Sequence, residues 1–124
     1  MDQVYQIFVD NLKKELNLSC EIKVYEMPVD YLGNNCGYCV EASEGLHEIV
    51  VNADLNTYAK LATVAHEMKH IQQCEEGRLK LVSGGYMWEG KFHSWEEFPF
   101  GEQPHEVEAN HFEKTTDFVR AIYE

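Results

Sequence analysis

The sequence predicts a small α+β domain with an N-terminal helix, a sheet of three to four mostly antiparallel strands, a central helix and a C-terminal helix. Three segments repeat apolar residues at the spacing of a helix. Short segments between the first two helices alternate apolar and polar residues, which is the period of a half-buried strand. With 124 residues, 44% of them hydrophobic, the chain is long enough for one packed core. We therefore expect residues 1–124 to form a single domain.

The N-terminal part of the chain predicts a helix followed by a strand. Residues 2–17 carry charges between apolar residues at helical spacing, as in an amphipathic helix that covers a sheet. These apolar residues are Val4, Ile7, Phe8, Leu12 and Leu16. Residues 20–27 alternate apolar with charged side chains, and Pro28 ends this predicted strand because proline cannot donate to a strand ladder. Residues 29–35 are then expected to form a loop.

A hairpin and the longest helix are predicted next. Segments 37–42 and 47–52 flank a turn-rich spacer, so we expect them to pair as antiparallel strands. Residues 54–76 then repeat apolar side chains at helical spacing, starting at Asp54 as a good capping residue and ending before a glycine. The apolar positions of this central helix are Leu55, Tyr58, Leu61, Ala62, Val64, Ala65, Met68 and Ile71.

The last third of the chain combines an irregular segment with a third helix. Residues 78–103 hold most of the glycines and aromatic residues without a sustained helical period, which predicts a hairpin or a folded loop. Pro104 suits the first turn of a helix, and helical spacing resumes after it. The apolar residues that continue this spacing are Val107, Phe112, Phe118 and Ile122. The third helix is therefore expected to run almost to the C-terminus.

Composition excludes some classes of partner. Lysine and arginine total 10 against 22 aspartate and glutamate residues, a formal charge of -12, so the surface should repel the phosphates of nucleic acids. No stretch approaches the roughly 18 apolar residues of a membrane span. The first residues also lack the pattern of an export signal. We therefore expect a cytoplasmic protein that binds neither nucleic acid nor membrane.

The four cysteines are expected to remain reduced thiols, because disulfides are rare in the cytosol. Cys36 and Cys39 form a CxxC motif, which can serve redox chemistry or supply half of a zinc site. Its glycine favours a turn that leads into a strand, whereas a redox motif should open a helix. Cys20 and His47 would have to complete a structural zinc site with this pair, and we favour plain buried or half-buried thiols instead.

The strongest chemical signal is the motif HExxH in the middle of the central helix, formed by His66, Glu67 and His70. Two histidines four residues apart project from the same helix face, so both imidazoles can reach one ion. Glu67 lies beside them, where it can hold a water molecule without being a ligand. A catalytic zinc requires a third protein ligand. The third helix offers Glu106 or Glu108 for that role.

This arrangement resembles the gluzincins, and it is especially similar to the ImmA/IrrE-like and other small phage and bacterial metallopeptidases. The resemblance covers residues 49–118 and is carried by His66, Glu67, His70, Glu106, Ala109 and Asn110. It implies a minimal zincin that binds Zn²⁺ and hydrolyses peptide bonds in a peptide or protein substrate. In that family pattern the first glutamate, Glu106, is the third ligand, with Glu108 as the fallback. Glu67 is the implied general base, and Asn110 would orient a zinc-bound histidine.

Further roles follow from the peptidase hypothesis. Tyr86, His93 and His105 are the candidates for polarising the scissile carbonyl. Segment 47–52 precedes the motif helix, so it could bind an extended peptide by strand addition, as edge strands do. Residues 84–100 would form either one wall of the cleft or a small aromatic core.

The alternative hypothesis is a non-catalytic binding or regulatory protein that uses the same fold and a structural zinc. A fourth protein ligand from His93 or His111 would favour it, because structural zinc sites are closed. The acidic surface would then suit a basic protein partner.

Overall fold

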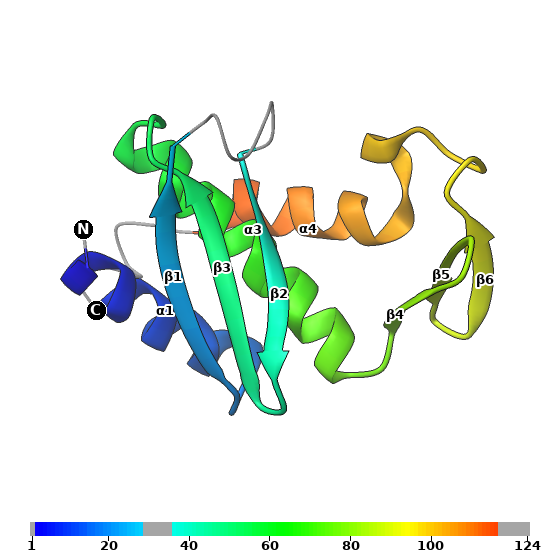
Figure 1. Ribbon diagram of the computed structural model, residues 1–124, viewed down its shortest axis with the longest axis horizontal. Coiled ribbons are helices and arrows are strands. Elements are labelled where there is room, and N and C mark those ends of the chain that lie inside the picture. The colour runs from blue at the N-terminus through cyan, green and yellow to red at the C-terminus, as the bar shows by residue number, and fades with distance from the viewer. Residues whose placement is uncertain (1, 29–35, 117–124) are drawn as a thin grey trace.

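The computed structural model describes residues 2–28 and 36–116, which form an α+β fold with three α-helices and two small sheets (Figure 1). The expected loop 29–35 and the C-terminal residues 117–124 lie outside the described residues. The elements are α1 (Asp2–Leu16), β1 (Glu21–Met27), β2 (Gly37–Ser43), β3 (Leu46–Asn52), α3 (Thr57–Glu75), β4 (Leu79–Val82), β5 (Gly85–Trp88), β6 (Lys91–Ser94), the 3-10 helix η1 (Phe100–Glu102) and α4 (Pro104–Thr115).

The first sheet has three strands in the order β1-β3-β2. The predicted hairpin is confirmed, since β2 and β3 pair antiparallel with Gly37 opposite Val51. In contrast, β1 is parallel to β3, with Glu21 opposite Leu46, so this sheet is mixed. Segment 47–52 is therefore hydrogen-bonded on both sides, and the prediction that it offers a free edge is wrong. A hairpin pattern does not show on which side the preceding strand adds.

The main core lies between the first sheet and the two helices α1 and α3, which pack on the same face of that sheet (Figure 1). The apolar stripe predicted for residues 2–17 is largely buried here. Fully enclosed core residues are Phe8, Leu12, Ile49, Val51, Val64, Ala65 and Met68. The apolar faces of α1 and α3 are buried together against the strand residues, which holds both helices on the sheet. An amphipathic helix is stable only when its apolar face is covered.

Helix α3 begins at Thr57, three residues after the predicted start. Asn56 is its capping residue, and the Asn56 side chain accepts a hydrogen bond of 2.8 Å from the Ala59 amide. The backbone amide of Asp54 instead donates to the Asn52 side chain in the turn that leaves β3. Asp54 therefore lies in this turn and does not cap the helix.

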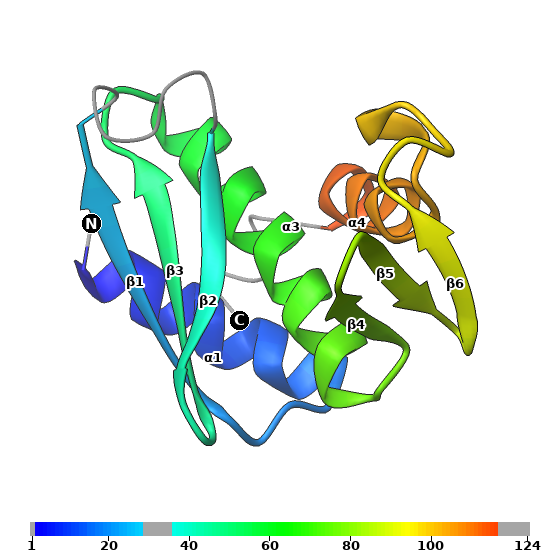
Figure 2. The ribbon, with the colours of Figure 1, turned by 45° about the vertical axis from the view of Figure 1, so that its right-hand side comes forward.

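The glycine-rich segment folds into a second antiparallel sheet, β4-β5-β6. It is built around Tyr86, which is fully buried and packs against the rings of His93, Trp95 and His105. Of the two interpretations of residues 84–100, this packing supports the small aromatic core. Figure 2 shows α3 between the first sheet on one side and α4 with the second sheet on the other.

Helix α4 starts at Pro104, as predicted, and packs along α3. It ends at Thr115, because Thr116 has extended backbone angles, with φ -71° and ψ 131°. The hydroxyl groups of both threonines donate to the Phe112 carbonyl at the end of the helix. The predicted extension through Phe118 and Ile122 lies outside the described residues. Nowhere in the described part of the chain is a helix long and apolar enough to cross a bilayer.

Candidate metal centre

Helix α3 places the two histidines of the HExxH motif side by side. The Nε2 atoms of His66 and His70 lie 3.1 Å apart, with the ring planes nearly perpendicular. Both residues are largely shielded from solvent, in the middle of a helix whose other face is held in the core. The helical spacing thus has the geometric effect that the sequence predicted, because both imidazoles face one point.

Glu106, in the first turn of α4, completes the group. Its Oε1 lies 2.9 Å from His66 Nε2, and its Oε2 lies 3.0 Å from His70 Nε2. Two imidazole nitrogens and one carboxylate, converging from two helices, match the three protein ligands of a catalytic zinc site. The chemistry of this donor set fits Zn²⁺, which His66, His70 and Glu106 could hold.

The electrostatics of the group follow from these short contacts. Burial alone would lower the pKa of His66, but the hydrogen bond to Glu106 and the neighbouring carboxylates raise it to about 9. Burial likewise opposes ionisation of Glu106, yet its bonds to the two histidines lower its pKa to about 2. In the metal-free protein a protonated imidazole thus bridges to an ionised carboxylate. A divalent cation would replace that proton, as expected at a metal site.

Glu67 lies beside the two motif histidines. Its carboxylate and the imidazole nitrogens of His66 and His70 all lie within 4.8 Å of one another. Glu67 is only 8% exposed, and burial raises its pKa above the usual range against the opposite effect of the two histidines. The thiol of Cys39, on β2, is hydrogen-bonded to it. A carboxyl group with a raised pKa is a better proton acceptor once it is ionised.

A second layer of side chains orients the two imidazoles. Glu113 Oε1 lies 2.8 Å from His66 Nδ1, and Gln73 Oε1 lies 2.8 Å from His70 Nδ1. The predicted role of Asn110 is therefore wrong, because other side chains hold both Nδ1 atoms. Glu113 follows Glu106 by seven residues, two helical turns along the same face of α4, and this spacing was the signal that could have identified it.

Glu108 makes different contacts from Glu106. It forms a two-pronged ion pair with Arg78, with N–O distances of 3.0 and 2.6 Å, and it also accepts a hydrogen bond from the Gln73 amide. Gln73 is hydrogen-bonded to both Glu108 and His70, so the Arg78–Glu108 ion pair helps to hold Gln73 in place next to His70. The geometry of this pair gives no reason to prefer Glu108 as the third ligand.

The three candidates for polarising a carbonyl differ in position. The ring of His105 lies next to the site, with its centroid 5.6 Å from that of His70. Burial is the main cause that lowers the pKa of His105 to about 4, so the ring is neutral. Tyr86 is fully buried behind it, and His93 Nδ1 is bonded to Glu97. Of the three, His105 is the one that contacts a motif histidine.

His93 and His111 are the predicted candidates for a fourth ligand. In the described part of the chain, neither belongs to a group of side chains that could hold a metal. His111 is exposed on α4, and His93 is part of the second sheet.

No protein family, no curated protein and no solved structure matches this chain. The function is therefore inferred from the geometry of this site.

Replacing Glu113 by alanine is expected to weaken zinc binding by about 10- to 100-fold, because the outer partner of a ligating histidine sets its orientation and basicity. Isothermal titration of the metal-free protein with zinc measures this change. Lys114→Ala, at an exposed position of the same helix, is the matched control and should bind zinc like the wild type. Equal affinities in the two variants would remove Glu113 from the site.

Proposed function

We propose that this protein is a zinc-dependent metallopeptidase of the gluzincin type. The observation that carries the proposal is the contact of one Glu106 carboxylate with both HExxH imidazoles, at 2.9 and 3.0 Å. A glutamate from a separate helix that closes on the motif is the ligand arrangement of a zinc hydrolase. The raised pKa of the buried Glu67 beside it adds a suitable proton acceptor.

Each residue has a defined part in the proposed reaction. His66, His70 and Glu106 would hold the zinc ion, which when bound polarises the substrate carbonyl and makes a water molecule acidic. Glu67 takes the proton from the attacking water and delivers it to the leaving amine, as a general base and then a general acid. Gln73 and Glu113 keep the histidines in one orientation through their Nδ1 atoms.

The substrate that suits this site is an extended peptide. Strand β2 forms an edge of the first sheet and contacts α3. The Cys39 thiol on this strand is hydrogen-bonded to Glu67, so a peptide added along β2 would pass close to the proposed base. The exposed side chains of Tyr38 and Val40 lie on the same strand. Strand addition is therefore proposed at β2, in place of β3.

A cytoplasmic location is part of the proposal. All four cysteines, Cys20, Cys36, Cys39 and Cys74, are free thiols, which a reducing compartment maintains. The chain has 22 acidic and 10 basic residues. This negative charge would repel a substrate bound to nucleic acid, so a free protein or peptide is the better substrate class.

Peptide cleavage tests the proposed function directly. The zinc-loaded protein is incubated with a diverse peptide library, and new N-termini are identified by mass spectrometry. We expect cleavage at a restricted set of sequences, loss of cleavage after chelation and its return with added zinc. A zinc-loaded protein that cleaves no member of the library, or one whose cleavage is insensitive to chelation, would contradict the proposal.

A further inference from the structure

A second group of metal-binding side chains lies apart from the HExxH motif. Cys20 precedes β1, His47 is on β3, and Glu75 is the last residue of α3. One potential ligand atom from each of the three lies within 4.8 Å of the others. The group shares no residue with the candidate metal centre, and it joins three segments that are far apart in the sequence.

The contacts within the group are short and directed. His47 is 4% exposed, and its Nε2 lies 2.7 Å from Glu75 Oε1. Glu41, on β2, brings a second carboxylate to the same nitrogen at 3.6 Å. The HExxH site shares one feature with this group, a carboxylate hydrogen-bonded to the imidazole nitrogen that would face a metal. The HExxH site brings two Nε2 atoms to one glutamate, whereas this group brings two glutamates to the single Nε2 of His47.

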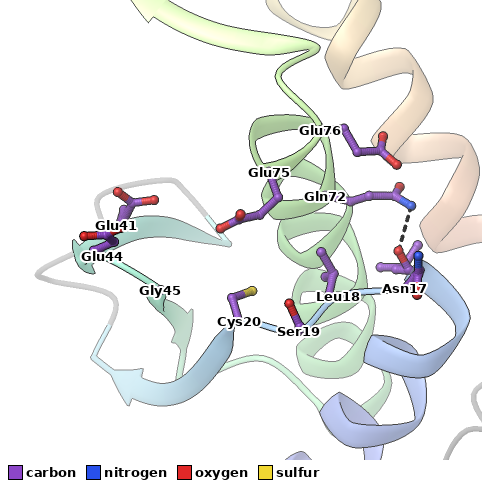
Figure 3. A pocket seen from close by; sticks show the side chains of 11 residues that line it. Asn17, Leu18, Ser19, Cys20, Glu41, Glu44, Gly45, Gln72, Glu75 and Glu76 are labelled. Atoms are coloured by element: carbon purple, nitrogen blue, oxygen red, sulfur yellow. Dashed lines mark hydrogen bonds between the residues drawn. The ribbon is translucent and has the colours of Figure 1, made fainter.

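The group borders a solvent-connected hollow of about 580 Å³. Cys20, just before β1, Glu41 on β2 and Glu75 on α3 line it (Figure 3). Cys20 is half-buried, and the Glu75 side chain is 39% exposed. An ion can therefore enter from solvent and still find a sheltered imidazole and thiol.

The donor set selects the class of metal. A thiolate and an imidazole suit zinc and its neighbours in the first transition row, whereas calcium and magnesium require oxygen ligands. The Cys20 thiolate and the Glu75 carboxylate would together balance the charge of a divalent ion, and Glu41 would leave the occupied site with one net negative charge. Ligand atoms around a tetrahedral zinc are separated by roughly 3.3–3.7 Å, given the usual bond lengths. The ligand atoms of Cys20, His47 and Glu75 lie within 4.8 Å of one another.

We propose that Cys20, His47 and Glu75 form a second zinc site, with Glu41 as the fourth ligand. Four protein ligands make this a closed, structural site. It ties the entry of β1 and the central strand to the end of α3, the helix that carries the HExxH motif. The site does not depend on the proposed peptidase activity.

Cobalt titration of the metal-free protein tests this site, because a thiolate ligand adds an intense near-ultraviolet charge-transfer band to bound Co²⁺. The HExxH site has no cysteine ligand and cannot produce that band. We expect the band in the wild type and in His66→Ala, its loss in Cys20→Ser, and its retention in Cys74→Ser, which removes the exposed thiol next to Glu75 on α3. Absence of the band at saturating Co²⁺, or its survival in Cys20→Ser, would overturn the proposal.

A second variant guards against a folding effect of the cysteine change. Glu75→Gln keeps every thiol but removes an anionic ligand. We expect it to weaken the Co²⁺ affinity, measured from the thiolate band, at least about tenfold. Far-ultraviolet circular dichroism compares the fold of all variants. An unchanged midpoint in Glu75→Gln would contradict the ligand set. If the thiolate site is absent but the protein still binds one metal ion that is lost in His66→Ala, the proposed peptidase function is unaffected.

Discussion

Replacing Glu106 by alanine is expected to weaken zinc binding at the HExxH site more than about 100-fold. Outer partners of metal ligands contribute about 10- to 100-fold, and a direct ligand contributes more. Glu106 also bridges both imidazoles, so its loss leaves His66 and His70 as a two-nitrogen site. Zinc titration in a Cys20→Ser background measures this affinity without a contribution from the second group.

Glu108→Ala is the matched control for this prediction, since it removes a carboxylate two residues away on the same helix. That carboxylate is engaged by Arg78 at 2.6 and 3.0 Å. The control should retain zinc with at most a small loss through Gln73. Wild-type affinity in Glu106→Ala, combined with loss of zinc in Glu108→Ala, would show that the ligand assignment is wrong.

Replacing Glu67 by glutamine is expected to reduce peptide hydrolysis by about 10²- to 10⁴-fold while zinc remains bound, which is the usual contribution of a general base. Glutamine keeps the shape of the side chain and cannot accept the proton. The measurement is kcat/KM on a peptide identified by the cleavage experiment, together with the zinc content of the same preparation.

The control for this change is Glu102→Gln, which alters an exposed carboxylate in η1, outside the site. It should hydrolyse the peptide at the wild-type rate. Full activity in a Glu67→Gln protein that carries zinc at the HExxH site would refute the role of Glu67 as the base.

The periodicity of apolar residues predicted the helices because the helical repeat is a local property of the sequence. The apolar positions from Leu61 to Ile71 repeat with the helical period, and the structure buries them against the first sheet. The same regularity places His66 and His70 on one helix face, independently of any tertiary contact. Choosing Glu106 over Glu108 needed the family resemblance, because both glutamates lie in the same turns of α4.

Other features could not be predicted because they depend on contacts between distant segments. The order β1-β3-β2 depends on where β1 docks, and the hairpin of β2 with β3 is compatible with either edge. Glu113 reaches His66 only because α4 packs along α3. Cys20 and Glu75 are 55 positions apart, and no spacing rule connects them.

Helix ends were the least predictable boundaries. Asp54 and Asn56 are both good capping residues, and the turn after β3 decides between them through the bond from the Asp54 amide to Asn52. At the other end, the hydroxyl of Thr116 bonds to the Phe112 carbonyl where α4 stops. Such local competition between caps shifts a boundary by a few residues.

The most direct test of the central claim is anomalous diffraction from zinc-loaded crystals, which locates the metal itself. We predict a zinc peak about 2.0–2.1 Å from the Nε2 atoms of His66 and His70, bonded also to Glu106, with one position open to solvent. An HExxH motif without such a peak would contradict the metal centre. A fourth protein ligand closing that position would contradict the peptidase and favour a structural zinc.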